Sequence, residues 1–132
     1  MKRFLLIILS LALCLPVLTG CTPKQVKKLN EVDIKRISVT TLPESYDYEY
    51  SFTGDDARAI VDYFSDLNMI PRLFGINKGG MAWVISIEYE DGSEATVYLY
   101  CDIIRVNGGM EYLINRDKAA IFEDLLENLN QK

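Results

Sequence analysis

Histidine is absent from the 132-residue chain, and cysteine occurs only at positions 14, 21 and 101. The first absence removes the commonest general base of enzymes and the commonest protein ligand of transition metals. The chain also lacks the G-x-S-x-G, H-E-x-x-H and C-x-x-C motifs and a P-loop. Because no catalytic motif is present, we expect neither an enzymatic activity nor a bound cofactor or metal.

Long apolar runs are equally scarce, since the single one covers residues 4–18. As a helix this run would reach about 22 Å, whereas the core of a bilayer is about 30 Å thick. It follows Lys2 and Arg3, contains Pro16 near its end and leads into small residues. A basic start, a short apolar middle and a small-residue end are typical of a secretory signal peptide, here residues 1–20.

The signal ends in Leu18-Thr19-Gly20-Cys21, which resembles the lipobox of bacterial lipoproteins. The resemblance covers only the first 21 residues. It implies that the Cys21 thiol receives a diacylglyceryl group and that the signal is cut before this cysteine. Two acyl chains hold a protein persistently at a membrane, whereas one holds it only marginally. We therefore expect a lipoprotein anchored at the cell membrane and facing away from the cytoplasm; a chance cysteine after an ordinary signal peptide and an uncleaved anchor are the alternatives.

Basic residues are outnumbered by acidic ones. Because residues 1–20 hold two of the 14 basic residues and none of the 19 acidic ones, residues 21–132 carry a net charge of −7. Such a domain repels phosphates, which argues against nucleic acid as a partner. With Cys14 in the signal and Cys21 lipidated, Cys101 has no partner for an intrachain disulfide. We expect its thiol to pack in the core rather than to act as a nucleophile.

The residues after the signal divide into a tether and one domain. Residues 21–31 are polar and predict a tether that begins with the lipidated cysteine, and residues 32–132 predict a single α+β domain in the order β-β-α-β-β-β-β-α. Hairpins dominate this order, so we expect an antiparallel sheet of about 5–6 strands with two helices on one face. Alternating and helical apolar patterns place strands at 32–41, 45–53, 82–89, 94–101, 102–106 and from 110, and helices at about 54–68 and 116–130.

Several local signals predict details of these elements. The apolar phase slips near Lys35-Arg36 and again near Cys101-Asp102, which predicts bulges or bends. Thr53 begins a capping box, and Asn115 can cap the last helix. The tyrosines of strand 45–53 alternate with polar residues, so we expect them to face the core, with an aromatic ligand platform as the alternative.

Two hairpins have registers that the sequence can decide. A two-residue turn at Asp91-Gly92 would pair Trp83 with Tyr100, whereas a three-residue loop shifts the pairing by one residue. Only the second register gives one apolar and one mixed face, so we expect it. A three-residue loop in the next turn pairs Arg105 with Glu111, which is a favourable pair of opposite charges.

The mixed face of the first hairpin is the candidate binding surface, because aromatic residues with polar tips are frequent at protein interfaces. We expect the apolar loop 69–80 to lie next to this surface. We expect this loop to tuck over the edge of the core, with exposure to a partner as the alternative. The candidate residues are Tyr98, Tyr100, Val84, Thr96, Leu73 and Phe74.

These observations predict a non-enzymatic binding or accessory module that the diacylglyceryl anchor on Cys21 holds at the membrane. Its ligand would be a protein, a peptide or an envelope polymer. A carboxylate-dependent envelope hydrolase, which would need two close acids in a deep cleft, and a purely structural envelope protein are the alternatives. Acidic residues that gather around one predicted turn are the best candidates for metal ligands, and they are Glu88, Glu90, Asp91 and Glu94. Acidic residues are equally typical of a solvated hairpin tip, so no metal site is predicted.

Overall fold

The computed structural model describes residues 23, 26, 28–43, 48–73 and 80–131. The predicted signal peptide and Cys21 lie outside the described residues, as do Tyr46 of the tyrosine strand and Phe74 of the apolar loop.

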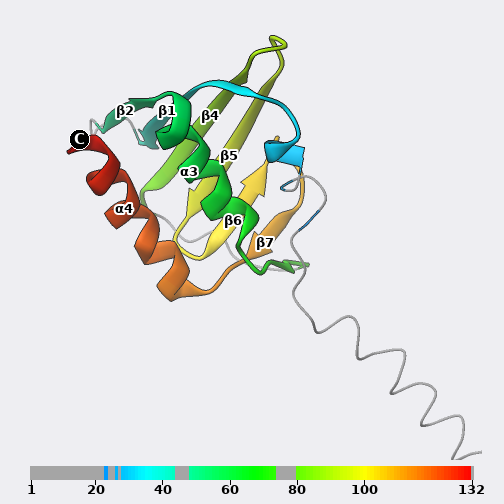
Figure 1. Cartoon of the computed structure of the whole chain (residues 1–132). Helices are drawn as coiled ribbons and strands as arrows, with labels where there is room; N and C mark the ends of the chain where they lie inside the picture. Colours follow the sequence, from blue (N-terminus) through cyan, green and yellow to red (C-terminus); the bar gives the residue numbers. More distant parts are fainter. Residues whose placement is uncertain (1–22, 24–25, 27, 44–47, 74–79, 132) are drawn as a thin grey trace, which may run out of the picture.

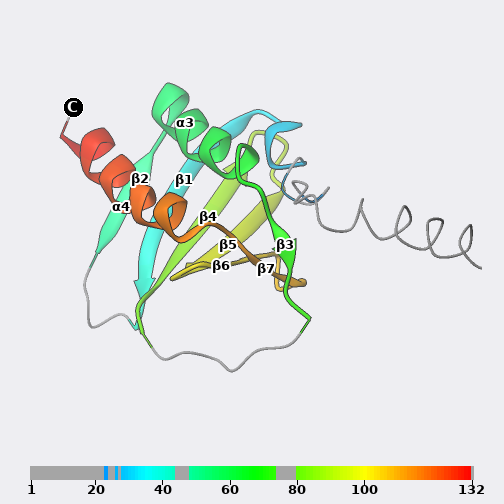
Figure 2. The ribbon, with the colours of Figure 1, turned by 90° about the horizontal axis from the view of Figure 1, so that it is seen from below.

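The described part of the chain forms one antiparallel sheet and two long helices (Figure 1). In chain order the elements are the 3-10 turn η2 (Lys28–Asn30), β1 (Ile34–Leu42), β2 (Glu49–Phe52), α3 (Gly54–Ser65), β3 (Ile70–Pro71), β4 (Ala82–Tyr89), β5 (Glu94–Tyr100), β6 (Ile103–Val106), β7 (Glu111–Leu113) and α4 (Arg116–Asn130). The seven strands lie side by side in the order β2-β1-β4-β5-β6-β7-β3. Both helices lie on one side of this sheet, and the opposite side, which we call the open face, carries neither (Figure 2).

The predicted α+β class with a mainly hairpin-built antiparallel sheet is therefore confirmed. The sheet has seven strands rather than 5–6, because Ile70 and Pro71, in the predicted loop, pair with Leu113 and Tyr112 of β7. This strand β3 lies at the edge of the sheet. Proline is tolerated there because its missing N–H removes no hydrogen bond from the interior of the sheet.

Both predicted hairpin registers are confirmed. Val84 pairs with Tyr98 across β4 and β5, which is the pairing that a three-residue loop requires. Gly92 in this loop has a φ of 81°, a conformation that glycine adopts without steric cost. In the next hairpin Arg105 pairs with Glu111. The two registers together decide which side chains of the sheet face the helices.

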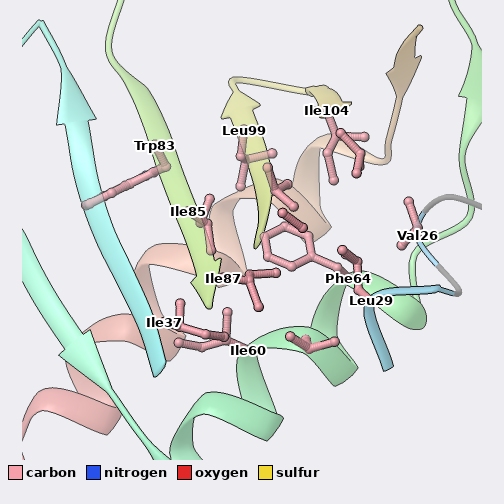
Figure 3. Close-up of a cluster of buried hydrophobic side chains, with 14 of the residues drawn as sticks. Val26, Leu29, Ile37, Ile60, Phe64, Trp83, Ile85, Ile87, Leu99 and Ile104 are labelled. Carbon is pink, nitrogen blue, oxygen red and sulfur yellow. The ribbon is translucent and has the colours of Figure 1, made fainter. Parts of the chain in front are cut away.

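The core fills the space between the sheet and the helices (Figure 3). The ring centroids of Phe64 in α3 and Phe122 in α4 are 5.4 Å apart, and Phe122 lies 6.1 Å from the ring of Trp83 in β4. The Tyr63 hydroxyl donates a hydrogen bond of 2.7 Å to the Lys118 carbonyl, and burial raises the pKa of Tyr63 to about 12. The two helices are thus joined to each other as well as to the sheet.

The signals at the helix ends have mixed outcomes. Asn115 caps α4, since its side chain accepts a hydrogen bond of 2.8 Å from the Asp117 N–H. Thr53 is the N-cap residue of α3, but its side chain makes no capping hydrogen bond, so the predicted capping box is wrong. Gly54 follows with a φ of 58°, which departs from helical geometry at the position where the box needs it. Ile121 lies beside the buried stripe of α4 and is 46% exposed.

The first two strands follow the sequence pattern in part. The register of β1 against β4 shifts between Ile34 and Arg36, where the phase slip predicts a bulge. Tyr48, just before β2, and Tyr50 and Phe52 within it lie on the helix side and stack on one another. Only Phe52 is buried, Tyr50 is half-buried and Tyr48 is 44% exposed. The expectation that this stripe faces the core thus holds for one end of the strand and fails for the other, because β2 is an edge strand.

Part of the predicted tether packs on the domain. Val26 is 0% exposed and Leu29 is 2% exposed, and both belong to the core (Figure 3). The Leu29 carbonyl accepts a hydrogen bond of 3.3 Å from the Tyr89 hydroxyl, and the Asn30 side chain donates one of 2.8 Å to a serine of α3. The folded part of the chain therefore begins near residue 26 rather than 32, because two apolar residues in a polar segment fill one end of the core.

The predicted core position of Cys101 is wrong. Tyr100 pairs with Ile103, so Cys101 and Asp102 form a tight two-residue turn between β5 and β6. Cys101 has a φ of 51° and is exposed. The change of apolar phase at this point is real, but a turn causes it, and a turn residue does not continue the alternation of the strand.

Candidate functional site

The four sheet residues of the predicted binding surface all lie on the open face. Val84, Thr96, Tyr98 and Tyr100 alternate along β4 and β5 with buried residues that face the helices, and each is partly exposed. The pairing of Val84 with Tyr98 places the two strands' contributions next to each other. The four residues therefore share one face of the sheet, as the predicted register requires.

A cleft of about 270 Å³ lies on this face. It is lined by residues from four neighbouring strands and from the end of β3, and we call it the sheet cleft: Arg72, Ala82, Tyr98, Tyr100, Ile103, Arg105 and Glu111. Two of the predicted residues, Tyr98 and Tyr100, line it, while Val84 and Thr96 lie on the same face outside the lining. The cleft combines an aromatic and aliphatic surface with charged groups at one side.

The charged side of the sheet cleft is a carboxylate held between two guanidinium groups. Arg72 Nη1 lies 2.8 Å from Glu111 Oε2, and Arg105 Nη2 donates a hydrogen bond to Glu111 Oε1. The hydrogen bond from Arg105, followed by the positive charges of both arginines, lowers the pKa of Glu111. Two positive charges against one negative leave the cleft with a surplus of one positive charge, in a domain that is acidic as a whole. The Arg105 side chain is 44% exposed and can contact a ligand.

Tyr100 is one of the residues that line the cleft. Its hydroxyl oxygen is shielded from solvent and has no hydrogen-bond partner among the residues that the structure describes. Desolvation is the main cause that raises the pKa of Tyr100, so the phenol stays protonated at neutral pH. Gly80 lies beside the ring, since a Cβ added to it would be in ordinary van der Waals contact with the ring at 3.8 Å. The polar tip of Tyr100 keeps a capacity to hydrogen-bond that the described residues do not use.

The described part of the apolar loop tucks onto the core only at Met69, its first residue. Leu73 is 75% exposed and Ile70 is 54% exposed, although Met69 just before them is buried. The reason is the pairing of β3 with β7, which carries the chain to the outer edge of the sheet. Leu73 therefore lies next to the sheet cleft, since it follows Arg72 directly, and the position of Phe74 lies outside the described residues.

A second cleft, of about 450 Å³, lies on the helix side of the sheet. It is lined by Met81, Trp83, Leu99, Cys101, Arg116, Ala119 and Ala120. The sequence does not predict it, because it forms where the start of α4 passes over the ends of β4 and β5. Arg116 lies 3.9 Å from Asp102 beside the exposed Cys101. Its lining is mostly apolar and contains no pair of convergent polar groups.

Groups suited to metal binding or to membrane crossing are missing from the described residues. No cluster of three or more histidine, cysteine, aspartate or glutamate side chains could hold a metal ion there. Glu88, a metal candidate from the sequence, forms ion pairs with Lys35 at 2.5 Å and with Arg36 at 3.0 Å. Within the same residues, no helix is both long and apolar enough to cross a membrane.

The charged residues of the cleft are not among the binding residues that the sequence predicts. Arg105 and Glu111 are predicted as a cross-strand pair, and the register also places Arg105 beside Tyr98. That register is the signal that links the pair to the tyrosine face. Arg72 gives no such signal, because it reaches the cleft only through the pairing of β3 with β7.

No family model matches the chain, and neither a curated protein nor a solved structure matches it. The candidate site is therefore judged by its own geometry.

Proposed function

We propose that the chain is a membrane-anchored, extracytoplasmic lipoprotein whose open face binds a protein, a peptide or an envelope polymer. The sheet cleft carries this proposal, because Tyr98, Tyr100 and Arg105 line one hollow on a face that neither α3 nor α4 covers. Tyrosine and arginine are the residue types that most often dominate binding energy at interfaces. A partner could bury the aromatic rings and pair with the surplus positive charge.

The anchor is supported by the lipobox-like residues and by the short apolar run before them. We expect Cys21→Ser to abolish the incorporation of labelled fatty acid and to leave the unprocessed precursor. Cys101→Ser, which removes the exposed thiol of the domain, serves as the control and should leave labelling unchanged. Labelling that persists in Cys21→Ser would place the anchor at another residue.

The binding face can be tested by affinity capture with residues 22–132 against envelope and secreted extracts. Tyr98→Ala should lose the captured partner. Tyr48→Ala is the matched control, because Tyr48 is also a partly exposed tyrosine but lies on the helix side, 5.7 Å from the ring of Trp83. A partner that Tyr98→Ala and Tyr48→Ala retain equally would contradict the assignment of the open face.

Binding is better supported than carboxylate-dependent hydrolysis. Among the described residues that line the sheet cleft, Glu111 is the single carboxylate. Its lowered pKa keeps it ionised at neutral pH, whereas a hydrolase of this kind needs a second carboxyl group that can donate a proton. The geometry of Glu111 between two arginines suits recognition of a charged ligand more than acid catalysis.

A further inference from the structure

Exposed large apolar side chains of the described residues gather at one edge of the sheet. Four of the seven lie on or next to β7 and β3, whereas the other three, Leu42, Tyr48 and Ile121, lie apart on β1, before β2 and on α4. Contiguous exposed apolar surface usually marks an interaction site. The four residues, which we call the apolar edge, are Ile70, Leu73, Met110 and Leu113, with exposed fractions of 54%, 75%, 50% and 38%.

The members of the apolar edge lie on or next to two adjacent strands, β7 and β3. Ile70 pairs with Leu113. Beyond the last β3–β7 pair, one more backbone hydrogen bond of 2.8 Å continues the register. One further step along this register reaches Leu73 and Met110, and the alternation of side chains places these two on the opposite face from Ile70 and Leu113. Exposed apolar side chains therefore lie on both faces of the outermost part of the sheet.

The chain's link to the proposed lipid anchor is short and joins the domain at Val26. Val26 is fixed in the core, and its N–H donates a hydrogen bond of 3.0 Å to the Pro23 carbonyl. Val26 is the fifth residue after Cys21, so the chain between the two can span at most about 18 Å. In both overall views the segment around Lys28–Asn30 lies on the side of the molecule that carries β7 and β3 (Figures 1 and 2).

Basic groups accompany the apolar edge in a chain that is otherwise acidic. Arg105 lies on the neighbouring strand β6 with its side chain 44% exposed, and Lys28 is exposed in η2. The sequence adds Lys24 in the link and Lys27 directly after Val26. Lysine and arginine close to an anionic bilayer surface are attracted to its headgroups. The positive charges of Arg105 and Lys28 thus favour contact of this side of the domain with an anionic bilayer.

We infer that the apolar edge rests on the bilayer that carries the anchor, with its four side chains in the headgroup region. This inference rests on the lipid anchor of the proposed function, which keeps the edge within reach of the membrane. The sheet then stands on its β7–β3 edge, and the open face is held beside the bilayer surface. The partner of the sheet cleft would accordingly be bound at the membrane surface rather than away from it.

Tryptophan fluorescence on vesicles tests this orientation. Residues 21–132 contain every buried residue that the structure describes, and in the Cys101→Ser background Cys21 is their only thiol. This thiol is coupled to a maleimide lipid in vesicles of phosphatidylcholine and phosphatidylglycerol in equal parts. Leu73→Trp reports on the apolar edge, and Ile121→Trp is the control on α4, with the native Trp83 as a common background. Circular dichroism confirms that both variants fold.

We expect the emission of tethered Leu73→Trp to shift to shorter wavelength and to be quenched by brominated lipid, while Ile121→Trp changes in neither respect. Equal emission and equal quenching of the two variants would overturn the membrane contact. This is also the result expected if the edge binds a protein rather than lipid. The tether in this experiment is chemical. Failure of Cys21 labelling in cells would therefore contradict the proposed anchor alone, and equal quenching on vesicles would contradict the membrane contact alone.

Discussion

The two sides of the sheet are built from the same strands but differ in what covers them. On the helix side Trp83, Ile85 and Ile87 are at most 8% exposed, and two helices and the segment around Val26 pack against them. On the open face their neighbours along the same strands are half-buried or exposed, and the sheet cleft lies on this face. Alternation with a period of two thus divides one sheet into a side that stabilises the fold and a side that remains available for contact.

The largest expected effect comes from removing an aromatic ring on the covered side. Trp83 packs against the rings of Tyr50 and Phe122, at centroid distances of 6.4 Å and 6.1 Å. Trp83→Ala should reduce the free energy of unfolding by about 3–5 kcal/mol, because it leaves a large cavity. Urea denaturation followed by circular dichroism measures this loss. Trp83→Phe keeps an aromatic ring and should lose clearly less; equal losses would show that the site does not pack as tightly as its burial implies.

A smaller loss is expected where the chain enters the domain. Val26→Ala removes two buried carbons and should cost about 2 kcal/mol. Lys28→Ala, two residues later and exposed, should change the free energy of unfolding by less than about 0.5 kcal/mol. The same denaturation measurement applies. If Val26→Ala were as neutral as Lys28→Ala, residues before 32 would be a tether after all, and the link to the anchor would be longer than five residues.

How far the sequence predicts this architecture depends on how local each signal is. Asp91-Gly92 and the glycines after Asn107 specify loops that fix the two hairpin registers, and these predictions hold because a turn acts on its own flanking residues. Strand β3 and the burial of Val26 depend on contacts with distant segments, which leave no periodic signal in two or three residues. The site divides in the same way: the tyrosines follow from a hairpin register, whereas Arg72 joins them only through tertiary pairing.

The open face should respond differently from the covered side when a ring is removed. Tyr98→Ala should reduce the free energy of unfolding by no more than about 1 kcal/mol, since the side chain is only half-buried. It should nevertheless weaken binding of a captured partner strongly, as expected for an interface hot spot. Denaturation and capture with the same protein preparation separate the two effects. A stability loss as large as that of Trp83→Ala would mean that the face is part of the core, and the binding surface would then move to the region of Leu73.

The smallest expected effect concerns the charges of the sheet cleft and their dependence on pH. The hydrogen bond from Arg105 and the charges of both arginines lower the pKa of Glu111 below its ordinary value of 4.5. A carboxyl group with a lower pKa in the folded state stabilises the fold above its unfolded pKa, and this contribution is lost as the pH falls through the folded pKa. The wild-type protein should therefore lose stability on acidification below pH 4.5, and Glu111→Gln should lose less over the same window.

Because the Glu111 side chain is 24% exposed, solvent screens these ion pairs and the difference should stay below about 1 kcal/mol. Urea denaturation at neutral pH and at steps below pH 4.5 measures it, with Glu123→Gln on the exposed side of α4 as the control for a lost negative charge. Glu111→Gln should also increase the surplus of positive charge in the cleft and strengthen the binding of an anionic partner. If Glu111→Gln and wild type respond identically to acid, the three charged groups do not act as a unit, and Arg105 would contact a ligand independently of Glu111.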